Sequence, residues 1–144
     1  MNNEILQQII NTISTSLEIY SYTAIGKALL KNRNPIVSAE YQPNQKQFPY
    51  ITITQQDNSY KDSTMEKIET ETNLVFEISI YDNKSNKINV TLTLGTIINE
   101  IMTNLGFRRN FNSPVPNIAN AKVYRLVQRY NGSYNSEINK IYKF

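Results

Sequence analysis

A strict alternation between residues 73 and 81 constrains the fold of this chain more than any other feature of its sequence. Every second position is apolar: Leu74, Phe76, Ile78 and Ile80. The intervening positions hold Val75, Glu77, Ser79 and Tyr81. Successive side chains of a β-strand point to opposite faces, so this two-residue period predicts a strand with one buried face. The fold must therefore contain a sheet that buries one side.

The segment after this strand changes to the spacing of a helix. Its apolar positions recur every three or four residues: Ile88, Leu92, Gly95, Ile98, Met102 and Leu105. This spacing predicts an amphipathic helix that buries this face. Ser85 suits the position of its N-cap, and Gly106 suits a left-handed C-cap.

The N-terminal region also has helical periodicity. Ile5, Ile9, Ile13 and Leu17 lie four residues apart and predict a first amphipathic helix. The β-branched run from Thr12 to Thr15 is expected to weaken this helix towards its end. A second, short helix is predicted between Tyr22 and Leu30, with Ala24, Ile25, Ala28 and Leu29 as its apolar residues; it ends before Pro35.

The remaining segments predict strands and loops. Residues 48–54 read as a strand, and residues 121–130 and 137–143 as two more, with Asn131 and Gly132 as the hairpin turn between them. Residues 35–48, 55–69 and 110–120 are predicted to be an extended connector and two loops.

The predicted elements define an α+β fold of two layers. Their order is α(α)ββαββ, with a mainly antiparallel sheet of about four strands and helices packed on one of its faces. The chain has 144 residues, of which 40% are hydrophobic, and no break in composition divides it. We therefore expect a single domain that spans residues 1–144.

The composition argues against an enzyme. The chain contains no cysteine and no histidine, which removes thiolate chemistry, the commonest metal ligand and the commonest general base. Its four glycines form no phosphate-binding loop. Glu66, Glu69 and Glu71 are the densest carboxylates, but they suit a solvated acidic stretch better than a catalytic pair. We expect no catalytic residue, cofactor or metal.

No membrane contact is expected either. The chain has no apolar run of the roughly 20 residues that a membrane span needs, and its first residues do not read as a secretory signal. The sequence therefore predicts a protein that is soluble and cytoplasmic when it is synthesised.

Charge is unevenly distributed along the chain. Residues 1–72 contain 6 basic and 8 acidic residues, whereas residues 73–144 contain 9 basic and 4 acidic residues. This polarity suits head-to-tail self-association or an anionic partner near the C-terminal half, and it also suits an ordinary solvated surface.

A candidate interface follows from the basic and aromatic residues of the C-terminal half. Arg125 and Arg129 lie four apart on a predicted strand and share a face with Val123 and Val127. The full candidate set is Arg108, Arg109, Tyr124, Arg125, Arg129 and Tyr130, with Lys61 and Glu66 on the loop. Arginine with tyrosine is typical of protein interfaces and of nucleic-acid contacts. The arginines equally suit ion pairs with Glu77 or Glu100.

Six segments together resemble the bacteriophage tail terminator, or tail completion, family. They are the N-terminal helix, Phe48-Pro49-Tyr50-Ile51-Thr52-Ile53, Phe76-Glu77-Ile78-Ser79-Ile80-Tyr81, the helix end Met102–Arg109, Val123–Tyr130 and Ile141-Tyr142-Lys143. They follow one another in the order seen in that family and cover most of the chain.

The resemblance implies a structural role without catalytic residues. It implies a subunit of a virion or tail-like particle, assembled in the cytoplasm of a bacterial host, that forms a hexameric ring. The ring would cap the tail tube and join it to the neck or head, with tube and connector proteins as partners and DNA passing through its lumen. The alternatives are a head-closure or neck protein, and a nucleic-acid-binding protein that uses the basic C-terminal half.

Overall fold

The computed structural model describes residues 2–39, 47–56, 71–116, 122–135 and 140–142. The helices of this part are α1 (Asn2–Ser21), α2 (Ala24–Leu30) and α3 (Lys87–Asn104). The strands are β1 (Ile36–Ser38), β2 (Tyr50–Gln55), β3 (Glu71–Asp82), β4 (Arg108–Pro114), β5 (Tyr124–Asn135) and β6 (Lys140–Tyr142). The α+β class is confirmed, and the sheet has six strands within the described residues where the sequence predicted about four.

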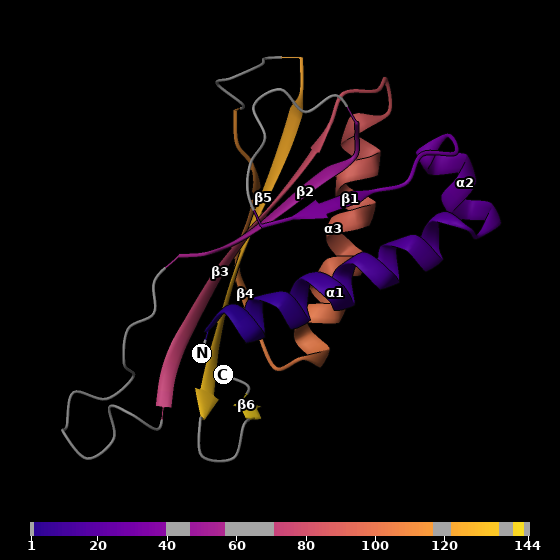
Figure 1. The fold of residues 1–144 in the computed structure, drawn as a ribbon. Helices are drawn as coiled ribbons and strands as arrows, with labels where there is room; N and C mark the ends of the chain where they lie inside the picture. Colours follow the sequence, from indigo (N-terminus) through magenta and orange to yellow (C-terminus); the bar gives the residue numbers. More distant parts are fainter. Residues whose placement is uncertain (1, 40–46, 57–70, 117–121, 136–139, 143–144) are drawn as a thin grey trace.

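The strands form one twisted sheet in the order β1-β2-β3-β5-β4 (Figure 1). Strand β1 runs parallel to β2, and the other neighbouring pairs are antiparallel. Strand β3 pairs with the whole length of β5. The other edge of β5 is shared, because β4 pairs with residues 126–131 and β6 pairs with residues 133–135.

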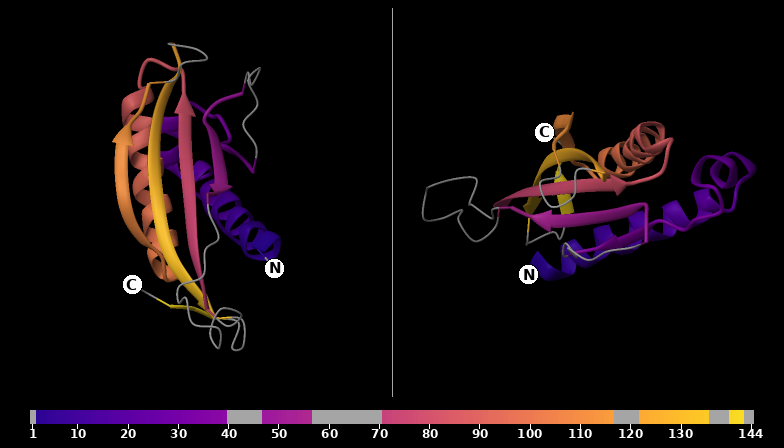
Figure 2. Two further views of the ribbon diagram at one scale, coloured as in Figure 1. Left: turned by 90° about the vertical axis from the view of Figure 1, so that its left-hand side faces the viewer. Right: turned by 90° about the horizontal axis from the view of Figure 1, so that it is seen from above.

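Helices α1 and α3 cover one face of this sheet, so the predicted two-layer arrangement is confirmed. In the left view of Figure 2 the sheet faces the viewer and both helices lie behind it. The core between the layers includes all four apolar positions of the alternating strand, each 0% exposed. It also includes Ile5, Ile9, Ile13 and Leu17 of α1, as the sequence predicted.

The opposite side of the sheet, called the open face below, carries the other set of alternating side chains. Its central members are Tyr50, Thr52, Glu77, Ser79, Tyr81, Arg125, Val127 and Arg129. None of the helices in the described ranges packs on it (Figure 2). Its exposed members are nevertheless few, because Tyr50, Thr52, Ser79, Tyr81 and Val127 are only 1–5% exposed. A small second apolar cluster of Tyr50, Tyr81 and Val123 lies there, with Ile36 and Phe48 packed against it.

The helices differ from their predicted forms in three details. Helix α1 continues to Ser21 past its β-branched run, because Ile13 and Leu17 are fully buried and their packing outweighs the weaker propensity. Helix α2 begins at Ala24, where the hydroxyl of Thr23 accepts a hydrogen bond from the backbone N–H of Gly26. Helix α3 begins after Asn86 rather than after a Ser85 cap.

The buried face of α3 is rotated from the predicted one. Its buried residues are Val90, Thr91, Leu94, Gly95, Ile98 and Met102. Ile88 and Leu92 were predicted to face the core but are 53% and 46% exposed. The end of the helix follows the prediction, because Gly106 adopts a positive φ of 104°.

Two predicted non-strand segments contain edge strands. Strand β1 lies inside the expected connector, and β4 begins just before the loop predicted at residues 110–120 and takes up its first half. The predicted turn at Asn131 and Gly132 is also wrong, because both residues lie within β5. Gly132 is needed there for another reason: a Cβ on it would meet Cδ1 of Phe107 at 2.5 Å.

Candidate interface on the open face

The register between β3 and β5 places each of the two predicted interface arginines opposite a residue that its side chain contacts. Arg125 lies opposite Tyr81, and Arg129 lies opposite Glu77. Directly opposite residues of antiparallel strands have their side chains on the same face and in contact. Both arginines therefore lie on the open face, as their four-residue spacing predicted.

Arg125 is fixed by a hydroxyl and by an aromatic ring. Its Nε and Nη2 atoms donate hydrogen bonds to Oγ of Ser79, at 3.3 and 3.2 Å. Its guanidinium carbon lies 5.7 Å from the centroid of the Tyr81 ring, within the range of a cation–π contact. The Tyr81 ring in turn lies 6.0 Å from the Tyr50 ring. A continuous line of contacts thus crosses β5, β3 and β2.

Arg129 is held by a carboxylate and by a second ring. Its Nη2 lies 3.4 Å from Oε1 of Glu77, so the pairing with Glu77 that the sequence allowed is confirmed. Its guanidinium carbon lies 4.8 Å from the centroid of the Phe111 ring, which β4 contributes. The Arg129 side chain remains 48% exposed and can still reach a partner.

Together the two arginines form a pair of stacked cations on one strand. Four residues of strand separate their Cα atoms by roughly 13 Å. Val127, which lies between them, is 1% exposed. Stacking restricts the rotamers of a long cationic side chain before any partner arrives, and this lowers the entropy cost of a later contact. The pair is suited to carboxylates or phosphates, because guanidinium groups bind both with charge-assisted hydrogen bonds.

The other predicted interface residues do not all join this pair. Arg108 lies opposite Asn131 and so belongs to the open face at the β4 edge. Arg109 lies opposite Tyr130, on the face that the helices cover, and a register shift follows it. Tyr124 packs against the main core. Lys61 and Glu66, with most of the loop predicted at residues 55–69, lie outside the described residues.

Tyr130 lies in the core rather than at a surface. It is 0% exposed, and its hydroxyl donates to Oε1 of Gln128 at 2.9 Å. The amide nitrogen of Gln128 donates to the carbonyl oxygen of Gly95 at 3.1 Å. Burial raises the pKa of Tyr130, and the nearby cation of Arg109 lowers it by less. The structure thus gives Tyr130 a packing role, which corrects its place in the candidate interface.

A second surface, not foreseen from the sequence, lies on the outer side of the helices. Its exposed apolar residues are Ile19, Tyr22, Ile25, Ile88 and Leu92, which are 46–75% exposed. They lie at the α1–α2 junction and in the first turns of α3. Two hydrogen bonds tie these parts together, from Lys31 to Ser85 and from Asn86 to the carbonyl of Leu29. We call this surface the helical corner.

Sequence reasoning missed part of the open-face site for a definable reason. The alternation of β3 already put Glu77, Ser79 and Tyr81 on one face. It did not fix the register that places Tyr81 opposite Arg125, because register depends on pairing between distant segments. Phe111 was missed because its strand was predicted to be a loop.

Comparisons with known proteins add no family assignment. A scan against protein-family models and a search of curated proteins both find no match. Among the helices of the described ranges, none combines the length and the apolar character that a membrane crossing requires.

Proposed function

We propose that this protein is a structural subunit of a phage tail or tail-like particle, where it forms a ring that caps the tail tube and joins it to the neck or head. The observation that carries the proposal is the presence of two unlike surfaces on opposite layers. The open face offers stacked cations, and the helical corner offers exposed apolar side chains. A ring requires such a pair, because each subunit must contact a different surface of the next.

The character of both surfaces supports a role in protein contacts. Arginine is enriched among the residues that dominate interface energies, and Arg125 and Arg129 are fixed in place by Tyr81 and Phe111. Large exposed apolar patches mark interaction sites, and the helical corner carries five exposed apolar side chains on neighbouring helices. The resemblance to tail terminators supplies the rest of the proposal: a hexameric ring, with tube and connector proteins as its neighbours.

Charge reversal on the open face tests this proposal. We expect Arg125→Glu and Arg129→Glu each to abolish ring formation, because each places a carboxylate where the partner surface expects a cation. Lys122→Glu makes the same change of charge three residues before Arg125, outside the stacked pair, and should assemble like the wild type. Sedimentation and chemical cross-linking, without and with purified tail tubes, would measure assembly. Normal assembly of both arginine variants would refute the interface role.

Nucleic-acid binding is the second candidate, and the two arginine–aromatic stacks on one open sheet face favour it. Stacked arginines contact the phosphates and bases of single strands. Each phosphate contact of a single strand contributes about 0.7 to the slope of log affinity against log salt concentration. Steep salt dependence that weakens in Arg125→Ala and Arg129→Ala would favour this candidate. If the affinity for single-stranded DNA changes neither with salt concentration nor with the two substitutions, nucleic-acid binding through this face is excluded.

A further inference from the structure

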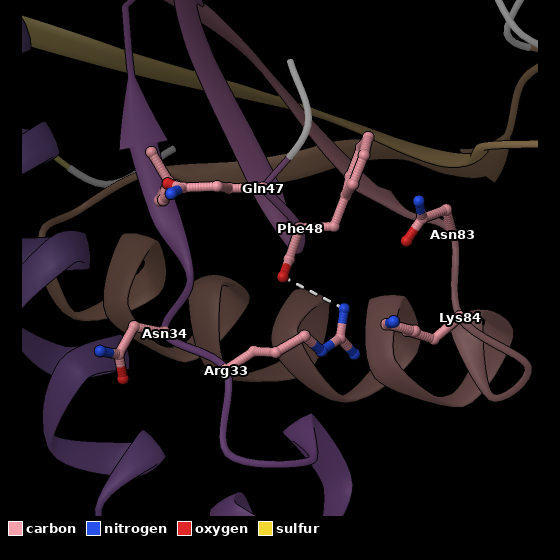
Figure 3. Close-up of a pocket in the computed structure, with 7 residues that line it drawn as sticks. Arg33, Asn34, Gln47, Phe48, Asn83 and Lys84 are labelled. Carbon is pink, nitrogen blue, oxygen red and sulfur yellow. Dashed lines mark hydrogen bonds between the residues drawn. The ribbon is translucent and has the colours of Figure 1, made fainter.

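Two cavities of the described chain differ in how far the fold already uses their lining. The first has a volume of about 420 Å³ at the end of the sheet, and Arg33 forms part of its lining (Figure 3). Arg33 donates hydrogen bonds to Asp82 at 2.6 Å and to the carbonyl oxygen of Phe48 at 3.1 Å, so its charge serves the fold. The second has a volume of about 270 Å³ and lies on helix α1. We call it the α1 cavity.

The α1 cavity lies between the N-terminal half of α1 and the end of α3. Its inner part is apolar, because Ile5 and Ile9 are only 6% and 2% exposed. Its outer part is polar and carries no charge. The complete lining consists of Ile5, Gln8, Ile9, Asn11, Thr12 and Leu105. An apolar cavity of about 150 Å³ already holds a benzene molecule, so this one has room for an aliphatic side chain.

Helix α1 also presents an exposed apolar side chain in line with this cavity. Ile19 is 62% exposed. Gln8, Thr12, Thr15 and Ile19 follow one another at spacings of four, three and four residues, so they form one stripe along the helix. All four are exposed. At about 1.5 Å per residue, Gln8 and Ile19 are roughly 16 Å apart along the helix axis.

We propose that two copies of this chain associate through antiparallel α1 helices, with Ile19 of each copy in the α1 cavity of the other. A two-fold axis midway between Gln8 and Ile19 places each of these residues opposite the other in the second copy. The same contact is therefore made twice, as in any symmetric dimer. The axis also places Thr12 opposite Thr15 of the second copy, and these short side chains let the two helices approach closely.

The composition of α1 supports a second copy as the occupant. Residues 5–17 contain no charged residue, so a second α1 can approach without burying an unpaired charge. The contact removes the apolar side chain of Ile19 from water in both copies at once. A single pair of helices buries less than the roughly 1,600 Å² of a standard interface, so we expect a weak dimer that forms at high protein concentration.

This dimer goes beyond the proposed ring and does not rest on it. It uses α1, whereas the proposed role of the ring contact is tested at Arg125 and Arg129 on the open face. Ile19 also belongs to the helical corner, so the dimer covers part of a surface that supports the ring proposal. A subunit would therefore leave the dimer before it joins a ring.

Sedimentation equilibrium of the full chain tests the dimer, at protein concentrations between about 10 μM and about 1 mM, the range of weak affinities. We expect a monomer–dimer equilibrium in the wild type. Ile19→Glu should weaken the dimer by about tenfold or more, because a carboxylate would then face the apolar cavity. Ile88→Glu makes the same change on α3, at a residue that is 53% exposed, and should dimerise like the wild type. Circular dichroism of both variants should stay that of the folded wild type.

Cysteine cross-linking tests the antiparallel register, because the chain contains no cysteine of its own. A mixture of the Gln8→Cys and Ile19→Cys proteins should form a disulfide-linked dimer on mild oxidation. Neither protein should do so alone, since its two cysteines would lie roughly 16 Å apart along the helices, beyond the about 7 Å that a disulfide allows between Cα atoms.

Three results would each overturn the inference. The first is a wild-type protein that stays monomeric at every concentration. The second is equal weakening of the dimer by Ile19→Glu and Ile88→Glu. The third is cross-linking of the Gln8→Cys protein alone at the rate of the mixture, which would place the two helices in another register.

Discussion

At the scale of single residues, the described part of the protein contains two arginine–carboxylate pairs in opposite environments. Asp82 is 0% exposed and accepts from Arg33, whose side chain is 17% exposed. Glu77 and Arg129 are 18% and 48% exposed. Removing one partner of a buried pair leaves an uncompensated charge, whereas water and salt replace an exposed partner at small cost. The first pair should therefore stabilise the fold, and the second should remain available for a partner.

Substitution of the two carboxylates separates these roles. Asp82→Ala should lower the free energy of unfolding by about 3–5 kcal/mol, because Arg33 stays largely buried without its counter-charge. Glu77→Ala should lower it by less than about 1 kcal/mol. Urea denaturation of both variants would measure the difference. Equal losses would contradict the assignment of a structural role to the Arg33–Asp82 pair alone.

The buried Tyr130 hydroxyl predicts a pH dependence at the alkaline end. Burial raises its pKa above the ordinary value of 10.0 in the folded protein, whereas the unfolded chain keeps the ordinary value. Below pH 10 both states hold the proton and Tyr130 adds no pH dependence. Above it only the unfolded state releases the proton, so the free energy of unfolding falls with rising pH, by at most about 1.4 kcal/mol per pH unit.

Tyr130→Phe isolates this contribution. The variant loses the hydrogen bond to Gln128 and should be less stable by about 1–3 kcal/mol at neutral pH. Between pH 10 and 11 its stability should fall less steeply than that of the wild type, as urea denaturation at several pH values would show. Parallel slopes for the two proteins would contradict a buried, protonated Tyr130.

At the scale of elements, the long periodic segments were predictable and the short edge strands were not. The alternation of β3 and the four-residue spacing of α1 predicted their buried faces, because each buries one stripe against the other layer. Strand β1 has only three residues, too few for a period. Strand β4 contains asparagines and Pro114, which resemble a loop, and it lies at the edge where such residues are tolerated.

Two further errors come from tertiary packing. Asn131 and Gly132 have the composition of a hairpin turn, but they pair with Val75 and Leu74 of β3 and so continue the strand. In α3, two adjacent sets of apolar residues both have helical spacing, so the sequence does not tell which set faces the core. The set with Val90 and Leu94 is buried, and the set with Ile88 and Leu92 lies in the helical corner.

Alanine substitutions on α3 test which of its faces is buried. Leu94→Ala should lower the free energy of unfolding by about 2–5 kcal/mol, because it leaves a cavity in the core. Leu92→Ala should change it by no more than about 0.5 kcal/mol, since surface substitutions have small effects. Urea denaturation of the two variants makes the comparison. A larger loss of unfolding free energy for Leu92→Ala than for Leu94→Ala would show that the face predicted from the sequence is the buried one.

At the scale of the whole molecule, the two layers leave different surfaces on opposite sides. The sequence could predict that Arg125 and Arg129 lie on the same face, because residues four apart on a strand point to the same side of the sheet. Their supports Tyr81 and Phe111 depend on register and on an unforeseen strand. The sequence could not predict the helical corner, because the spacing of apolar residues along a helix does not tell which of them are buried and which are exposed.

Negative-stain microscopy of the purified protein, alone and mixed with purified tail tubes, tests the central proposal most directly. We expect rings, or caps on the ends of the tubes, in the wild type. The variant that carries both Arg125→Glu and Arg129→Glu should form neither, while its circular dichroism stays that of the folded wild type. Bare tube ends with the wild-type protein, or caps that form equally well with the folded variant, would contradict the account.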